Sequence, residues 1–181
     1  NMEILNMKQK PWKEIKEIYF EAFPKSEQKP FFTVRSSVKK KKAQLLTAME
    51  NAVLQGFVIT IPYKDMVMVD YLAVSSKIRS CGTGSKILQE VCRRFPDKKI
   101  VLLIERLNDA AENNEQRIAR RKFYFKNGFT SSGIYITGRN GNMEILNLGG
   151  TVSMEEYMDL QQYALGKLMF RLSEIRPALS R

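Results

Sequence analysis

The segment from Val67 to Glu105 constrains the fold most, because the period of its hydrophobic residues changes twice. It begins within a run rich in Val, Met, Leu and Tyr, DMVMVDYLAVSS at Asp65–Ser76, which is typical of a strand. From Gly84 to Phe95, apolar residues recur at i, i+3, i+4, i+7 and i+11, the stripe of an amphipathic helix. The mostly apolar run KKIVLLIE follows at Lys98–Glu105 and is typical of an internal strand. This order predicts a crossover that joins two parallel strands.

The remaining segments predict shorter elements, most of them joined by tight turns. We expect a strand at Met2–Leu5, helices from Pro11 to Pro24 and from Phe31 to the Lys39–Lys42 run, strands over 43–51 and 54–63, a helix ending at Asn127–Gly128, a hairpin over 129–148, and a final helix over 151–170 with Tyr157, Leu160, Ala164 and Leu168 buried. The predicted fold class is α/β (α+β), with a mixed, mostly antiparallel central sheet flanked by helices and an additional C-terminal helix. We expect one domain over 1–150 and a helical extension over 151–181 packed on it.

Composition excludes several classes of protein. The 181 residues contain no apolar run near the ~20 residues that cross a bilayer, and the N-terminus lacks a signal-peptide layout. We therefore expect a cytoplasmic protein with no membrane partner. There is no histidine, which excludes Ser-His-Asp and Cys-His catalysis, and two cysteines are too few for a zinc site, so we expect no metal.

The net charge of +11 attracts polyanions such as nucleic acid, anionic lipid and phosphorylated cofactors. A soluble basic protein without a nucleic-acid role is the simpler interpretation, and we favour it. The Lys39–Lys42 run has two interpretations, phosphate binding or a solvated helix end where cations suit the dipole, and we favour the second.

The stretch IRSCGTGSKIL, at residues 78–88, has the composition of a phosphate cradle. A helix start exposes unpaired N–H groups, and glycines there let a bulky anion come close. Hydroxyls and one fixed cation complete the set, which comprises Arg79, Ser80, Cys81, Gly82, Thr83, Gly84 and Ser85. The alternative is a tight turn with a helix cap. Rossmann and Walker A loops fail on spacing, since Ile87 stands where the former needs a third small residue and Lys86 is one place too late for the latter.

Two motifs together resemble a known family. YLAVSSKIRSCGTGSKIL is similar to the acetyl-CoA motif of the GNAT superfamily of acyl-CoA N-acyltransferases, with Arg79, Gly82 and Gly84 at the R/Q-x-x-G-x-G/A positions. FYFKNGF, at Phe123–Phe129, is similar to a second family element, F-Y-x-x-x-G-F. The resemblance covers Met2 to about Leu148, implies a GNAT-like fold, and leaves the final helix outside.

The resemblance implies an acyltransferase that moves an acetyl group from acetyl-CoA directly to a primary amine in a ternary complex, which needs no histidine. The diphosphate would lie on the amides of residues 80–85, and the strand end, Leu72, Ala73 and Val74, would pair with the pantetheine arm. The Val74 N–H would polarise the thioester carbonyl. Cys81 would be a small residue of the cradle.

For proton transfer, the resemblance places Tyr124 as the acid that protonates the departing thiolate. Glu105 and Glu27 are equal candidates for the base, ahead of Asp70. The acceptor stays open among small amines, peptide N-termini and lysines, and the last helix or the hairpin could pair two subunits as a homodimer. The alternative function is a non-catalytic or CoA-binding GNAT-like module that acts on RNA or the ribosome through its basic surface.

Overall fold

The crossover expected from the sequence is present. Strand β4 (Met66–Val74) is followed by helix α3 (Thr83–Arg94) and strand β5 (Lys99–Glu105). β4 and β5 are parallel, and their register pairs residues 66–68 with residues 99–101. Ile87, Leu88 and Val91 on the predicted apolar stripe of α3 are buried. The change of period in the sequence therefore predicted both the elements and their parallel pairing.

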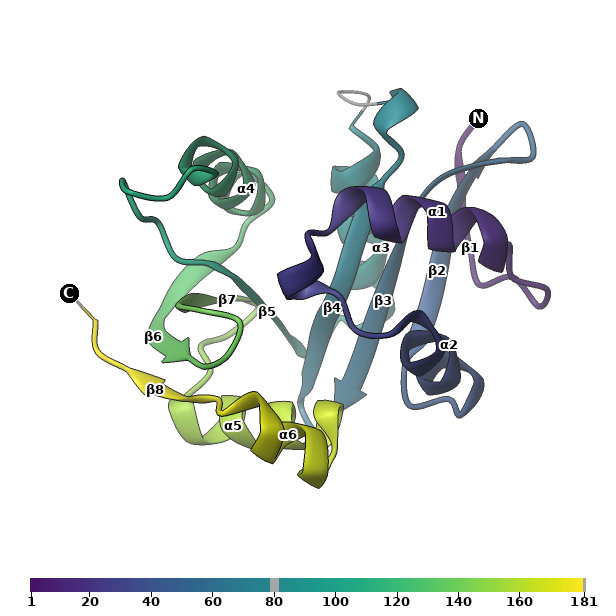
Figure 1. Ribbon diagram of the computed structural model, residues 1–181. Helices are drawn as coiled ribbons and strands as arrows, with labels where there is room; N and C mark the ends of the chain where they lie inside the picture. Colours follow the sequence, from purple (N-terminus) through teal and green to yellow (C-terminus); the bar gives the residue numbers. More distant parts are fainter. Residues whose placement is uncertain (79–81, 181) are drawn as a thin grey trace. The chain divides into compact units, whose positions relative to one another are not determined.

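The structure is a computed structural model that describes residues 1–78 and 82–180 (Figure 1). The other elements are β1 (Glu3–Leu5), α1 (Trp12–Ala22), η1 (Lys25–Glu27), α2 (Phe31–Lys39), β2 (Gln44–Glu50), β3 (Val53–Tyr63), η2 (Ser76–Ile78), α4 (Asn114–Lys126), β6 (Thr130–Thr137), β7 (Met143–Leu148), α5 (Met154–Leu165), α6 (Lys167–Ser173) and β8 (Arg176–Ala178). The strands lie in the order β1-β2-β3-β4-β5-β7-β6-β8. The pairs β1–β2, β2–β3, β5–β7, β6–β7 and β6–β8 are antiparallel. The sheet is mixed and mostly antiparallel, as predicted.

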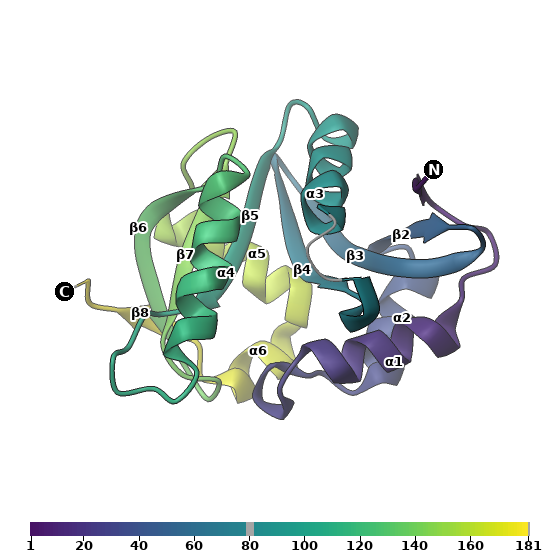
Figure 2. The same cartoon turned by 90° about the horizontal axis from the view of Figure 1, so that it is seen from above.

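The chain forms two compact units, and the first comprises residues 1–62 and 69–96. Helices α1 and α2 cover one face of its strands, and α3 covers the other (Figures 1 and 2). Buried side chains fill both interfaces: Ile15, Tyr19, Val34 and Val38 on the α1–α2 side and strand residues such as Phe57 and Val58. A helix with one apolar stripe must bury it against a sheet face, which explains this layering.

The second unit comprises residues 63–68 and 97–181. Helix α4 lies on one side of the strands β5, β7 and β6, and α5 lies on the other (Figure 1). Its core includes Ile145, Tyr157 and Leu160, which are fully buried, and Gln161 donates a hydrogen bond of 2.9 Å to the Tyr157 hydroxyl. That bond gives the buried phenol oxygen a donor, which offsets part of the cost of burying it.

The predicted final helix is wrong in its second half. Ser153 and Glu156 form the expected capping box, and α5 begins there. Gly166 then adopts φ +80°, a value that favours glycine, and the chain turns into a separate short helix, α6. Leu168 is consequently 69% exposed instead of buried, and Ala164 is only half-buried. Strand β8, which pairs with β6, was not predicted at all. The division at residue 150 stays a prediction.

None of the helices in the described part of the chain combines the length and the apolar character that a membrane span requires. Within residues 1–78 and 82–180, no group of three or more His, Cys, Asp or Glu side chains is arranged to hold a metal ion.

Candidate active site

The end of β4 presents backbone amides on the edge away from β3. The Ser75 amide donates to the Gln55 carbonyl of β3 at 2.8 Å. Because successive amides of a strand point to opposite edges, the Val74 and Leu72 amides point away from β3. The Ala73 side chain is buried, while those of Leu72 and Val74 are half-buried. The predicted strand end therefore has the donors that an added, strand-like ligand would use.

The start of α3 is open at the position where the motif places glycine. Gly82 caps the helix with φ +73° and ψ +11°, in the left-handed region. A Cβ built there meets no atom within 4 Å outside its chain neighbours. Thr83 is buried, and the amides of residues 83–85 belong to the first turn, where no intrahelical acceptor exists. Arg79, Ser80 and Cys81 lie outside the described residues, so their predicted roles stay predictions.

Gly56, on β3, is a residue that the sequence analysis missed. A Cβ at Gly56 would lie 2.6 Å from the Ala73 carbonyl oxygen and 3.2 Å from the Val74 Cα. It would also lie 3.3 Å from the Ile87 Cδ1 of α3. The signal in the sequence was an isolated glycine within a strand pattern, which marks a close backbone approach. Gly56 thus lets the end of β4 lie close to β3 and α3.

Replacing Gly56 with alanine is expected to lower the free energy of unfolding by about 1–3 kcal/mol, because the new methyl group collides with backbone. Urea unfolding measures this loss. Gly133→Ala is the control, since a Cβ at Gly133 meets nothing within 4 Å and only its φ of +76° opposes alanine. A loss below about 0.5 kcal/mol in Gly56→Ala, the usual range for a surface change, would show that the backbone approach at Gly56 is not tight.

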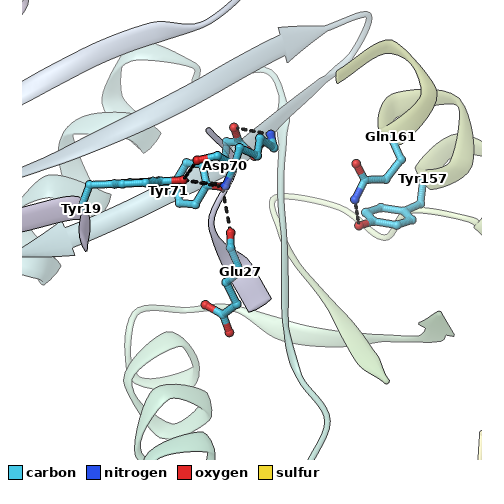
Figure 3. A network of polar contacts seen from close by, with 7 residues as sticks. Tyr19, Glu27, Asp70, Tyr71, Tyr157 and Gln161 are labelled. Atoms are coloured by element: carbon cyan, nitrogen blue, oxygen red, sulfur yellow. Dashed lines mark hydrogen bonds and ion pairs between the residues drawn. The ribbon is translucent and has the colours of Figure 1, made fainter. Parts of the chain in front are cut away.

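A cluster of polar contacts, here called the Tyr71 network, ties the loop around η1 to β4 (Figure 3). The network comprises Tyr19, Glu27, Lys29, Asp70 and Tyr71. The Tyr71 hydroxyl donates to the Glu27 carbonyl at 2.9 Å, and the Tyr19 hydroxyl donates to the Lys29 carbonyl at 2.8 Å. The Lys29 amide donates back to Tyr19 at 2.7 Å. The rings of Tyr19 and Tyr71 meet edge to face at 5.0 Å. Two buried tyrosines thereby hold the loop around η1, which is not part of the sheet.

The network engages Asp70 and fixes the backbone of Glu27. The Lys29 ammonium lies 3.0 and 3.1 Å from the two Asp70 carboxylate oxygens. The Glu27 carboxylate points away from the tyrosine hydroxyls (Figure 3). Burial, with the Asp70 charge second, raises the pKa of Tyr71 far above its usual value, so Tyr71 stays protonated throughout the working pH range.

Tyr71→Phe is expected to lower the free energy of unfolding by about 1–3 kcal/mol, because the Glu27 carbonyl loses its donor. Urea unfolding measures this loss. An unfolding free energy within about 0.5 kcal/mol of wild type, the usual range for a surface change, would contradict the network's role.

Tyr124 lies in the last turns of α4, where the FYFKNGF motif folds back on itself. The Phe129 amide donates to the Tyr124 carbonyl at 3.1 Å, and Gly128 makes the turn with φ +91°. The Tyr124 ring lies 5.5 Å from the Phe129 ring and 5.2 Å from the Phe123 ring, both edge to face. Tyr124 is 9% exposed. The motif therefore sets the orientation of a mostly buried phenol.

Glu105, at the end of β5, uses both carboxylate oxygens within the second unit. Arg117 of α4 lies 2.7 Å from one oxygen, and the Asn113 amide donates to the other at 3.2 Å. A second bridge, which the sequence analysis missed, joins Arg121 of α4 to the buried Glu144 of β7 at 2.8 Å. The only sign of this bridge in the sequence was the spacing of Arg117 and Arg121, which puts both arginines on one face of α4. These pairs fasten the helix that carries Tyr124, so Glu105 has a positioning role, and its role as a base stays a prediction.

The structure brings the predicted residues together in two sets. The first unit holds Leu72–Val74, the described part of the cradle at residues 82–85, and Glu27. The second unit holds Tyr124 and Glu105. Each set is built on strands and on the helix ends next to them.

The comparisons with known proteins now identify the family. Residues 41–131, half of the chain, match the family described as the acetyltransferase (GNAT) domain. This match contains β4, the glycine-rich turn, α3 and FYFKNGF. The chain therefore belongs to the GNAT family of acetyltransferases. No curated protein matches the sequence.

Solved structures of the family share the fold at low sequence identity. A protein from Bacteroides thetaiotaomicron assigned to the GNAT family has a TM-score of 0.68 and 19% identity, covering 88% of this chain and 92% of its own. The ribosomal-protein-S18-alanine N-acetyltransferase of Escherichia coli has a TM-score of 0.65 and 17% identity, covering 86% and 97%. A GNAT family acetyltransferase from Elizabethkingia anophelis with acetyl-CoA bound has a TM-score of 0.60 and 16% identity, covering 82% and 97%. These likenesses support the fold alone.

Proposed function

We propose that this chain is an acetyl-CoA-dependent N-acetyltransferase that acts in the cytoplasm and acetylates a primary amine directly. The observation that carries the proposal is the open, left-handed Gly82 at the start of α3, together with the outward amides at the end of β4. Both features lie in the first unit and both suit one ligand with an anionic head and an extended amide-bearing arm.

The residues present fit acetyl-CoA. The amides of residues 82–85, with Arg79, Ser80 and Cys81, would hold the diphosphate, and Leu72, Ala73 and Val74 would pair with the arm. When bound, acetyl-CoA supplies an activated acetyl thioester. The Val74 amide, fixed by the neighbouring Ser75–Gln55 hydrogen bond, would donate to the thioester carbonyl and stabilise negative charge on its oxygen.

Tyr124 would donate its hydroxyl proton to the sulfur of the departing thiolate. The pKa of a free tyrosine, ~10, is close to that of a thiol, so this transfer needs little driving force. The packing of its ring between Phe123 and Phe129 supports the role, because a general acid must be held in one orientation.

Glu27 is the base that we favour for the acceptor amine. The family resemblance places the loop around η1 on the acceptor side, and the Glu27 carboxylate points away from the tyrosine hydroxyls (Figure 3). The Tyr71 network supports Glu27 by fixing its backbone.

Glu27→Gln is expected to lower kcat by about 100-fold, the scale of general base catalysis. Glu105→Gln should lower kcat much less and lower the melting temperature, since it weakens a pair at 2.7 Å. Thiol release at saturating acceptor, with thermal melts of both variants, separates the two roles. If Glu105→Gln alone loses turnover, the assignment is reversed.

The class of amine that accepts the acetyl group is determined with a panel of amines. Small amines, a peptide with a free N-terminus and a peptide with an internal lysine are each incubated with acetyl-CoA, and free thiol release is followed. We expect release above the acceptor-free rate with one of the three classes. Thermal stabilisation by acetyl-CoA is measured in parallel, because a ligand that binds only the folded state raises its stability.

The alternative, a non-catalytic module that acts on RNA or the ribosome, gives a different result. It predicts no amine-dependent thiol release, with or without stabilisation by acetyl-CoA. If no amine causes thiol release and acetyl-CoA does not stabilise the chain, the proposed enzyme is wrong.

A further inference from the structure

One segment of the first unit, residues 28–49, is rich in basic residues and contains no acidic residue. Residues 28–49 contain six Lys or Arg residues and no Asp or Glu. One of the six, Lys29, is paired with Asp70 in the Tyr71 network. Lys39, Lys40 and Lys41, at the end of α2, are exposed, and no carboxylate of the described residues forms an ion pair with them. Ion pairs among the described residues therefore do not neutralise the positive charge of these three lysines.

The backbone that carries these lysines is ordered by hydrogen bonds. The Lys40 amide donates to the Ser36 carbonyl at 2.9 Å, and the Lys41 amide donates to the Val38 carbonyl at 3.1 Å. Lys41 itself adopts φ +61°, and the Ala43 amide closes the turn on Ser37 at 3.0 Å. A favourable interaction with the helix dipole accounts for cations in the last turn of α2. It does not account for lysines continuing through a closed turn beyond the helix end.

An exposed aromatic ring lies on the same side of α2 as the charges. Phe32 is 77% exposed, so its ring is accessible to a ligand. Phe32, Arg35 and Lys39 follow i, i+3 and i+7, so they share one helical face. The Arg35 guanidinium lies 5.3 Å from the Trp12 ring of α1, which holds it in place. The opposite face of α2 is used in the core through Val34 and Val38.

We propose that Phe32, Arg35 and Lys39–Lys41, here called the Phe32 surface, bind single-stranded nucleic acid. An exposed ring offers a stacking platform for an unpaired base, and ordered cations beside it contact the phosphates. An anionic bilayer fits less well, because interfacial helices insert a whole apolar face, and the apolar face of α2 is already buried. The inference goes beyond acetyl transfer and does not depend on it.

The test uses a fluorescein-labelled oligo(U) RNA of about 12 nucleotides, a length within the usual site sizes. Fluorescence anisotropy measures its affinity for the full chain over a range of salt concentrations. Lys39→Gln/Lys40→Gln/Lys41→Gln should weaken binding and reduce the slope of log K against log salt by about 2, at about 0.7 per lost phosphate contact. The matched control is Lys122→Gln/Lys126→Gln/Lys167→Gln, which removes three exposed lysines of the second unit and should leave the slope unchanged.

Phe32→Ala should lower the affinity for the oligonucleotide about tenfold. Phe32→Trp should bind it about as tightly as the wild type, because stacking tolerates any aromatic ring. A duplex of the same length should bind more weakly than the single strand. Melting temperatures of all variants check that each is folded.

The proposal is overturned if the two triple variants lose affinity equally, or if Phe32→Ala binds like wild type. It is also overturned if the oligonucleotide is not bound and phosphatidylserine vesicles are, with the same residues required. Because the readout is binding, its failure leaves the acetyl transfer activity untouched.

Discussion

Gly82→Val is expected to lower the affinity for acetyl-CoA by about 100-fold or more, a loss of about 2.8 kcal/mol. A β-branched residue cannot adopt φ +73° without strain, so the turn before α3 would have to rearrange. Its side chain would also enter the space beside the first-turn amides that is open in the native chain. Isothermal titration calorimetry with acetyl-CoA gives the affinity directly.

Gly82→Asn is the matched control for backbone strain. Asparagine tolerates the left-handed region far better than valine, so the turn should persist, and binding should fall by less than in the valine variant. Native affinity in Gly82→Val, with a melting temperature showing that the variant is folded, would exclude the cradle as the diphosphate site.

Tyr124→Phe is expected to lower kcat by about 100-fold while the Kd for acetyl-CoA stays within about twofold of wild type. The substitution removes only the hydroxyl, and the edge-to-face contacts with Phe123 and Phe129 are kept. The loss should therefore be confined to the step in which the thiolate leaves. Thiol release at saturating acceptor and calorimetry measure the two quantities.

The control for this second prediction is Tyr135→Phe, which removes a hydroxyl from β6, where the ring lies under the Arg106 guanidinium at 4.1 Å. It should leave kcat unchanged. Unchanged turnover in Tyr124→Phe with a good acceptor would remove Tyr124 from the mechanism and leave its ring as part of the core.

The features predictable from the sequence were those encoded in local periodicity. The stripe from Gly84 to Phe95 and the apolar run at Lys98–Glu105 give α3 and β5, because α3 buries one face and β5 is buried on both. The glycine-rich turn and FYFKNGF were recognisable because their spacing is short and fixed along the chain. The capping box at Ser153 belongs to the same class.

The features that were not predictable depend on contacts between distant parts of the chain. Gly56 is explained only by the approach of Ala73 and Ile87, which are 17 and 31 positions away. The Tyr71 network joins residues more than 40 positions apart, and the pairing of Glu105 with Arg117 could not be read from either residue. Gly166 interrupted an apolar pattern that otherwise favoured one continuous helix.

A crystal structure of the chain with bound coenzyme A would show whether the start of α3 and the end of β4 hold this cofactor. We expect the diphosphate within hydrogen-bond distance of the amides at residues 82–85, and the pantetheine arm paired with Leu72–Val74. A structure in which the coenzyme lies elsewhere, or in which side chains fill the space beside Gly82, would contradict it.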